Sequence, residues 1–154
     1  MKILTQLSIF LINEPGRLAT LTHALAKDKN NISALTLMDS TEHGVLRLVV
    51  DDPKRAAALL ERLGFQVSTT EVVAAEMPNR PGALASLAGM LAENHINVDY
   101  AYVTSGAPGG RTLCILKVPY LNKAMEVLRK GLGREAEAEA PDRRRTQISK
   151  KAGR

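Results

Sequence analysis

A short loop motif occurs twice in this chain, and its residue types suit the binding of an anion. The first copy reads Asn13-Glu14-Pro15-Gly16-Arg17-Leu18, and the second runs from Asn79 to Leu84. Proline keeps the residue before it extended, and glycine, which has no Cβ, lets backbone or ligand approach closely. The residues that follow begin a helix, whose first N–H groups have no intrahelical acceptor. Such a helix N-terminus, at the positive end of the helix dipole, is a receptor for a carboxylate.

Asparagine side chains are spaced to complete such a site. Asn13 and Asn79 open the two motifs, and Asn31 and Asn97 follow eighteen residues later. An amide both donates and accepts hydrogen bonds, which suits an ammonium and a carboxylate side by side. The same pattern also suits a simple strand-to-helix turn with Asn as the cap and Gly as the hinge. Residues 13–18 alone leave both interpretations open.

The motif belongs to an internal duplication. A shift of 66 residues superposes nine of the twenty positions from 13 to 32 on identical residues, whereas about one or two would match by chance. Two repeats are therefore expected, at residues 1–70 and 71–140, followed by a basic tail at 141–154.

Each repeat is expected to fold as strand, helix, strand, strand, helix, strand. Strands are predicted at 4–12, 32–38, 45–50, 98–103 and 112–118. Asp52-Pro53 is typical of an N-cap followed by the first helical position. The helices are indicated by apolar positions spaced three and four apart: Leu18, Leu21, Thr22 and Leu25; Ala56, Leu59, Leu60 and Leu63; Leu84, Leu87, Ala88 and Leu91; and Leu121, Ala124, Met125 and Leu128.

Two segments decide how the repeats are joined and closed. Residues 65–77 contain no Gly, Pro or Asn on which to turn, so we expect one extended segment to serve both repeats. Residues 135–140 alternate Glu and Ala, which could form a thin edge strand, a helix or a disordered end. The second sheet is then either incomplete or completed by a partner chain.

The composition predicts a cytoplasmic protein with an aliphatic core and no membrane contact. Hydrophobic residues make up 45% and charged residues 24% of the chain, and Trp is absent. No apolar run approaches the roughly 20 residues that span a bilayer, and the N-terminus does not resemble a signal peptide. The net charge of +5 comes from the tail, where six basic residues face only Asp142. The tail is expected to be solvated and disordered, and nucleic-acid binding is not expected.

The combined motifs resemble the ACT domain. The resemblance rests on Asn-x-Pro-Gly-x-Leu with Asn31-Ile32 or Asn97-Val98 eighteen residues later, and on residues 32–35 and 43–53, which are similar to small stand-alone tandem-ACT proteins. It covers residues 3 to 132. It implies an α+β fold with two ferredoxin-like βαββαβ repeats, antiparallel sheets and helices on one face.

The resemblance also implies a non-catalytic regulatory protein that binds a free amino acid where the first loop of one ACT unit faces the second strand of a neighbouring unit. A homodimer coupled to a partner enzyme or regulator is expected. Some ACT domains carry a ligand-binding histidine two residues before the first Asn, but Leu11 and Met77 stand there, so a branched-chain or aromatic amino acid is favoured. The ligand-binding residues implied are Asn13, Glu14, Pro15, Gly16, Arg17, Leu18, Asn31, Ile32, Asn79, Arg80, Pro81, Gly82, Ala83, Leu84, Asn97 and Val98.

No pattern for catalysis, a cofactor or a metal accompanies the loops. Cys114 lies in a predicted core strand and is expected to act as a small hydrophobe. The three histidines lack metal-like spacing, and residues 106–110 lack the Lys-Ser/Thr of a phosphate loop. Tyr100 and Tyr102 share one face of a predicted strand. Two interpretations are open: they are core and interface residues, or they form a wall of the effector pocket.

Three alternative functions compete with the interpretation as an amino-acid-binding regulator, and catalysis is not expected. A nucleic-acid-binding module of the RRM type would need aromatic residues on its central strands, where only Phe10 is present, so only the basic tail favours it. An acylphosphatase-like enzyme would need an arginine in a phosphate-cradling loop, and Pro15-Gly16-Arg17 has no accompanying acid–base pair. The third alternative is a regulatory subunit of a metabolic enzyme.

Overall fold

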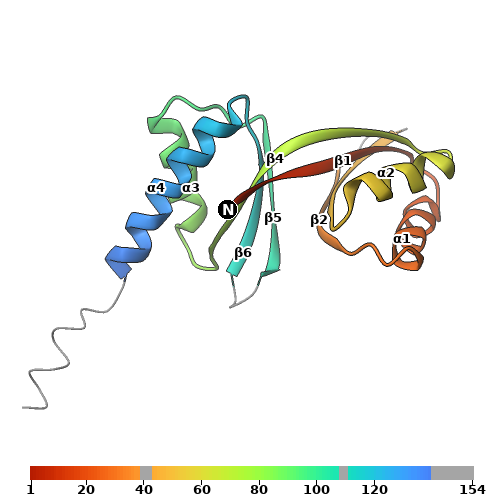
Figure 1. Ribbon diagram of the computed structural model, residues 1–154, viewed down its shortest axis with the longest axis horizontal. Helices are drawn as coiled ribbons and strands as arrows, with labels where there is room; N and C mark the ends of the chain where they lie inside the picture. The colour runs from red at the N-terminus through yellow and green to blue at the C-terminus, as the bar shows by residue number, and fades with distance from the viewer. Residues whose placement is uncertain (39–42, 108–110, 140–154) are drawn as a thin grey trace, which may run out of the picture.

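In the part of the chain that the structure describes, six antiparallel strands form one continuous sheet, on which four helices pack in two pairs (Figure 1). The computed structural model describes residues 1–38, 43–107 and 111–139, so the basic tail lies outside the described residues. The elements are β1 (Lys2–Ile12), α1 (Arg17–Lys27), β2 (Ile32–Met38), β3 (His43–Val50), α2 (Pro53–Arg62), β4 (Gln66–Pro78), α3 (Ala83–Glu93), β5 (Tyr100–Ala107), β6 (Arg111–Lys117) and α4 (Leu121–Glu139). The strand order is β2-β3-β1-β4-β6-β5. The predicted α+β fold of ferredoxin-like repeats is confirmed, with the two sheets joined into one.

A single strand of 13 residues, β4, connects the two repeats. Its first part pairs with β1, from Gln66 opposite Phe10 to Ala74 opposite Lys2. Its last part, Val73 to Pro78, pairs with β6. The predicted extended junction is confirmed, and the boundary expected between residues 70 and 71 falls inside this strand. Because β4 belongs to both halves, its backbone hydrogen bonds set their relative orientation.

The start of β1 supplies the fourth strand of the second repeat. The first repeat has the strand order β2-β3-β1-β4, and the second has the equivalent order β5-β6-β4-β1. Residues 2–4 pair with Val72–Ala74, at the position that the last strand of a ferredoxin-like repeat would take. The Glu/Ala segment is helical through Glu139, as part of α4. Alanine and glutamate are good helix formers and poor strand formers, and β1 already occupies the edge that such a strand would need.

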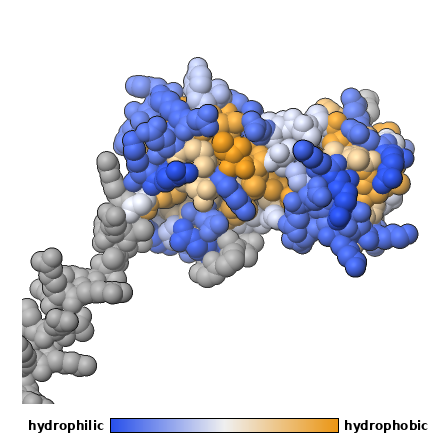
Figure 2. Space-filling view, in the orientation of Figure 1, coloured by the Kyte–Doolittle hydropathy of each residue, from blue (hydrophilic) through white to orange (hydrophobic). Residues whose placement is uncertain are grey.

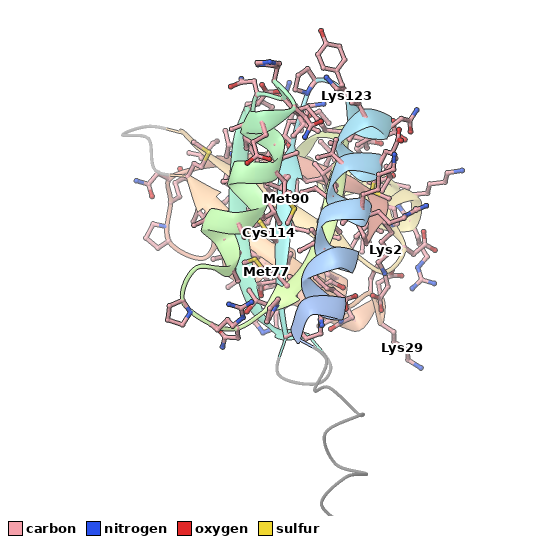
Figure 3. The ribbon with its side chains drawn as sticks, turned by 90° about the vertical axis from the view of Figure 1, so that its left-hand side faces the viewer. Lys2, Lys29, Met77, Met90, Cys114 and Lys123 are labelled. Atoms are coloured by element: carbon pink, nitrogen blue, oxygen red, sulfur yellow. The ribbon has the colours of Figure 1, made fainter. Side chains whose placement is uncertain are left out.

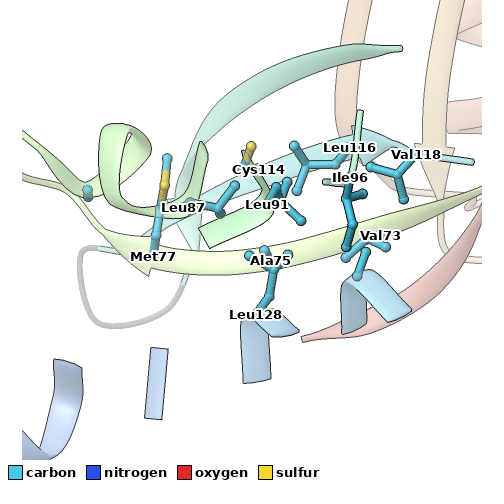
Figure 4. Packing of buried hydrophobic residues seen from close by; sticks show 12 residues of the cluster. Val73, Ala75, Met77, Leu87, Leu91, Ile96, Cys114, Leu116, Val118 and Leu128 are labelled. Carbon is cyan, nitrogen blue, oxygen red and sulfur yellow. The ribbon is translucent and has the colours of Figure 1, made fainter. Parts of the chain in front are cut away.

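Each helix pair covers a separate core on the sheet. Under α1 and α2, the fully buried residues include Leu7, Ile9, Leu21, Leu25, Leu48 and Leu60. In the second half, α3 and α4 lie side by side, with Met90 and Cys114 between them in the view of Figure 3. Figure 4 shows Leu87, Leu91 and Leu128 converging on Ala75 and Cys114. Cys114 is fully buried in this core, as predicted for a small hydrophobe, and burial raises the pKa of its thiol to about 11.

A third buried cluster lies where the two halves of the sheet meet on its helix-free face. It contains Ala34, Val49, Val72, Ala74 and Ile115. The twist of the sheet brings the edge strands β2 and β5 close together there. We call this cluster, together with the polar side chains beside it, the inter-repeat joint.

The polar part of the joint is centred on Gln6, which has no exposed surface. Its Nε2 donates to Tyr100 Oη at 2.9 Å and to Ser8 Oγ at 3.1 Å. Tyr102 donates its hydroxyl proton to Gln6 Oε1 at 3.0 Å, and Arg47 stacks 4.0 Å from the Tyr100 ring centroid. Burial, and secondarily Tyr100, raises the pKa of Tyr102, while Arg47 lowers it in part. Tyr100 and Tyr102 are therefore residues of the core contact between repeats.

Three helices end in the same hydrogen-bonded turn. After α1, Asn30 N donates to Leu25 O at 2.9 Å and Lys29 N to Ala26 O at 3.0 Å; the same two bonds follow α2 and α3. This is the Schellman arrangement, in which one residue must adopt a left-handed conformation. After α2 this residue is a glycine, Gly64, with φ 84. After α1 and α3 it carries a side chain: Lys29 has φ 56 and His95 has φ 54.

Lys29→Gly and His95→Gly are each expected to raise the free energy of unfolding by roughly 0.5–1 kcal/mol. The left-handed conformation costs a residue with a Cβ about 1–2 kcal/mol, which exceeds the roughly 0.5–1 kcal/mol of extra chain entropy that glycine loses. Urea denaturation followed by circular dichroism measures the change. Gly64→Lys is the reverse control and should destabilise; a destabilised Lys29→Gly would contradict the account.

Candidate functional site

The two Asn-x-Pro-Gly loops share one backbone conformation. Gly16 and Gly82 are the N-cap residues of α1 and α3, both with φ 87. A Cβ built on either glycine would have no heavy atom within 4 Å. The left-handed backbone therefore explains these glycines better than the close approach suggested by the sequence. No side chain caps either helix, so the interpretation of Asn13 and Asn79 as caps is wrong.

The uncapped N-terminus of α1 keeps backbone donors available. Arg17 N donates to Glu14 O at 3.4 Å, whereas the N–H groups of Leu18 and Ala19 have no acceptor within the helix and no side-chain cap. They lie at the positive end of the helix dipole, which attracts negative charge. The loop can therefore receive a carboxylate by its backbone alone.

A pocket of about 230 Å³ opens beside this first loop. The volume lies below the roughly 300–1,000 Å³ of pockets that hold drug-sized ligands, so it suits a small metabolite. The loop lies at the right-hand end of Figure 1, an end at which Figure 2 shows apolar surface. The lining residues are Leu11, Ile12, Asn13, Glu14, Arg17, Leu18, Leu37, Met38 and Gly44. Polar groups of the loop thus face an apolar wall contributed by β1, β2 and β3.

Arg17 is held in the pocket wall by an aromatic ring. Its guanidinium carbon lies 4.8 Å from the centroid of the Phe65 ring. Phe65 is 4% exposed and belongs to the core under α1 and α2. The Arg17 Nε atom is buried and has no hydrogen-bond partner among the described residues. At the equivalent position of the second repeat, Ala83 is packed in the other core.

Within one chain, the predicted site residues of the first repeat form two groups. Asn13, Glu14, Arg17 and Leu18 line the pocket, and Pro15 and Gly16 shape the turn that leads into α1. Asn31 and Ile32 lie beyond the other end of α1, in a separate pocket of about 410 Å³. A helix of 11 residues spans about 16 Å. The fold therefore does not bring Asn13 and Asn31 together in one chain.

The second loop lies at the opposite end of the molecule from the first (Figure 1). Asn79, Arg80, Pro81, Gly82 and Leu84 are exposed there. Asn97 is also exposed and donates from Nδ2 to Asp99 Oδ1 at 3.4 Å. Val98 packs against the second core, and both residues precede β5, which begins at Tyr100 rather than at Val98.

Sequence reasoning missed five of the lining residues, among them Leu11 and Ile12 at the end of β1, and it missed the ring that supports Arg17. Leu37, Met38 and Gly44 come from the facing ends of β2 and β3, and Phe65 supports Arg17 from the end of α2. The available signal was weak: Leu37-Met38 places two large apolar residues in succession at the end of a strand.

Among the described residues, no cluster of His, Cys, Asp and Glu could hold a metal ion. In the same part of the chain, no helix combines the length and apolar character that a membrane span needs.

Comparison with known proteins gives concordant matches over most of the chain. A family model described as an ACT domain pair matches residues 1–137. The crystal structure of a protein from Bacteroides thetaiotaomicron is similar at a TM-score of 0.76 and 38% identity, over 83% of this chain and 88% of that one. The ligand-free regulatory subunit of aspartate kinase from Thermus thermophilus shares the fold at a TM-score of 0.62 and 14% identity, over 85% and 97% of the two chains. No curated protein sequence matches. The chain belongs to the ACT domain family and carries its domains as a pair.

Proposed function

We propose that this protein is a non-catalytic regulator that binds a free amino acid in the pocket beside residues 13–18. The observation that carries the proposal is the pocket itself, which combines the open N–H groups of α1 with an apolar wall in one small volume. An amino acid has the matching chemistry, because its carboxylate suits the helix N-terminus and its side chain suits the wall. Membership of the ACT domain family supports a regulatory role.

The pocket lining favours a branched-chain or aromatic ligand. Leu37 and Met38 belong to the apolar wall, and Leu18 adds an apolar side chain from α1; an apolar ligand side chain gains free energy by leaving water there. Glu14 and Asn13 offer oxygen acceptors for an ammonium group.

A second copy of the chain would complete the site. Ile12, Leu18, Leu37 and Met38 are each between 38% and 48% exposed, so a ligand bound to one chain would keep one side in water. β2 is an edge strand of the sheet and has unpaired backbone groups along one side. If β2 paired antiparallel with its copy, the Met38 end of one chain would meet the Asn31-Ile32 end of the other. A homodimer of this kind unites the two groups of predicted residues in two composite sites.

A chain of contacts connects the pocket to the second repeat. Arg47 contacts the sulfur of Met38 in the pocket wall and stacks on Tyr100 in the inter-repeat joint. A ligand that moves Met38 would therefore change the packing of the joint, and such differential contacts are what coupling requires. The structural neighbour that is a regulatory subunit of aspartate kinase supports a partner enzyme as the receiver of this signal.

Isothermal titration against the twenty amino acids tests the proposal. We expect a branched-chain or aromatic amino acid to bind with a dissociation constant below about 1 mM, which corresponds to roughly 4 kcal/mol. Sedimentation velocity in the same buffers measures whether the chain is a dimer. If the folded protein binds none of the twenty below the millimolar range, the proposal is wrong.

Leu18→Glu is expected to weaken ligand binding at least about tenfold. The new carboxylate would stand in the pocket wall, where it repels the ligand carboxylate and removes apolar contact. Leu84→Glu is the matched control, since Leu84 occupies the same loop position in the second repeat and is 46% exposed. Equal loss of binding in both variants would place the ligand elsewhere; far-UV circular dichroism confirms that both remain folded.

A further inference from the structure

Arg17 is a cation whose position is set but whose charge has no partner. Its guanidinium carbon lies over the Phe65 ring, 4.8 Å from the centroid, and the Nε atom is buried without a hydrogen bond. Among the described residues, none forms an ion pair with it. A buried donor of this kind costs free energy unless a ligand satisfies it.

The fold fixes this arrangement before any ligand arrives. Gly64 adopts φ 84 at the end of α2, and Phe65 N then donates to Leu60 O at 3.0 Å. The ring is therefore anchored in the core under α1 and α2. A receptor group that is already in place loses little entropy on binding.

We propose that Arg17, supported by Phe65, binds the α-carboxylate of the ligand and makes the first repeat the ligand-binding repeat. This inference rests on the proposed function and adds its specificity-determining residue. A guanidinium carries five N–H donors in a planar fork, and two of them match the two oxygens of a carboxylate. The N–H groups of the first turn of α1 add to the same anion site.

The other charged residue of the pocket fits the rest of the ligand. Glu14 lines the same pocket, and no ion pair joins it to Arg17. One acceptor and one donor of opposite charge thus remain available within one small pocket, as a zwitterionic α-amino acid requires.

The second repeat lacks this group. Ala83 stands at the position of Arg17, is 6% exposed and packs with Leu87 and Leu91 in the second core. An arginine there would have to displace core side chains. The two repeats therefore differ in the one side chain that recognises a carboxylate, and one ligand per chain is expected.

The test compares an amino acid with its α-amide, which lacks the negative charge. The ligand found by titration of the wild-type protein is measured by calorimetry beside its amide, with the wild type, Arg17→Lys, Arg17→Met and Phe65→Leu. We expect the wild type to prefer the acid at least about tenfold. Arg17→Met should lose this preference, because its affinity for the acid falls much further than its affinity for the amide. Arg17→Lys should keep part of the preference, and Phe65→Leu should reduce it while the charge is retained.

The outcomes separate this inference from the proposed function. If the wild type binds no amino acid, both are overturned. If the wild type binds the acid but Arg17→Met keeps the acid-over-amide preference, or loses acid and amide equally, the role of Arg17 is overturned and the proposed function stands. A stoichiometry of two ligands per chain would overturn the assignment to the first repeat. Urea denaturation of each variant shows whether the fold is intact.

Discussion

Gln6→Leu is expected to lower the free energy of unfolding by roughly 2–4 kcal/mol. Gln6 is fully buried, and its amide donates to Tyr100 and accepts from Tyr102. Leucine has a similar volume but leaves both phenol groups without that partner, and a buried unsatisfied group costs about 1–3 kcal/mol. Urea denaturation at neutral pH, followed by circular dichroism, measures the loss.

A double-mutant cycle separates the hydrogen bond from the packing. Tyr102→Phe removes the hydroxyl group that donates to Gln6 Oε1. The double variant Gln6→Leu/Tyr102→Phe should therefore lose about 1 kcal/mol less stability than the sum of the two single variants. Ser8→Ala is the mild control, because Ser8 is only partly buried and shares one bond with Gln6. A Gln6→Leu protein as stable as the wild type would show that the polar joint does not hold the repeats together.

The free energy of unfolding is expected to fall as the pH rises above 9, because unfolding releases a buried acid. The pKa of Cys114 is raised from 9.0 to about 11 in the folded protein. Between these values the unfolded chain has lost the thiol proton and the folded chain retains it, so stability decreases with pH. The buried, protonated thiol contributes its full stabilisation below pH 9. A pKa difference of about two units corresponds to a loss of roughly 2–3 kcal/mol in the free energy of unfolding by pH 11.

Tyr102 is expected to extend this loss of stability above pH 10, the ordinary pKa of a tyrosine. Burial raises the pKa of Tyr102 in the folded protein, so the unfolded chain loses the phenol proton first. Cys114→Val should flatten the curve between pH 9 and 11, and Tyr102→Phe should flatten it above pH 10. Tyr120→Phe is the control, since Tyr120 is 62% exposed and should leave the curve unchanged. Urea midpoints at half-unit pH steps give the curves; an unaltered slope in Cys114→Val would show that the thiol ionises freely in the folded state.

Much of the fold could be predicted because it is encoded over short distances. The helical stripe at Leu21 and Leu25 is buried as its spacing predicts, and Asp52 accepts from Arg55 N as the N-cap of α2. The lack of turn residues between 65 and 77 predicted the shared strand. Each of these signals depends on neighbours along the chain, where spacing alone defines the geometry.

The candidate site was only half predictable for the same reason. The loop at residues 13–18 and its exposed helix N-terminus follow from Pro15 and Gly16, but the apolar wall comes from residues that approach only through strand pairing. Gly44, for example, pairs with Leu11 across β1 and β3. For Asn31 the local pattern was misleading within a single chain. Its spacing from Asn13 predicted a place in the same site, but it lies beyond the far end of α1.

The sequence by itself determined the duplication, the order of elements within each repeat and the two glycine turns, since all of these arise from local backbone preferences and side-chain periodicity. Only the tertiary structure decided how the repeats differ. Residues 2–4 complete the second sheet, Gln6 meets two tyrosines 94 and 96 positions away, and Phe65 positions Arg17. These contacts depend on the register and twist of one six-stranded sheet, which bring together residues that no local pattern connects.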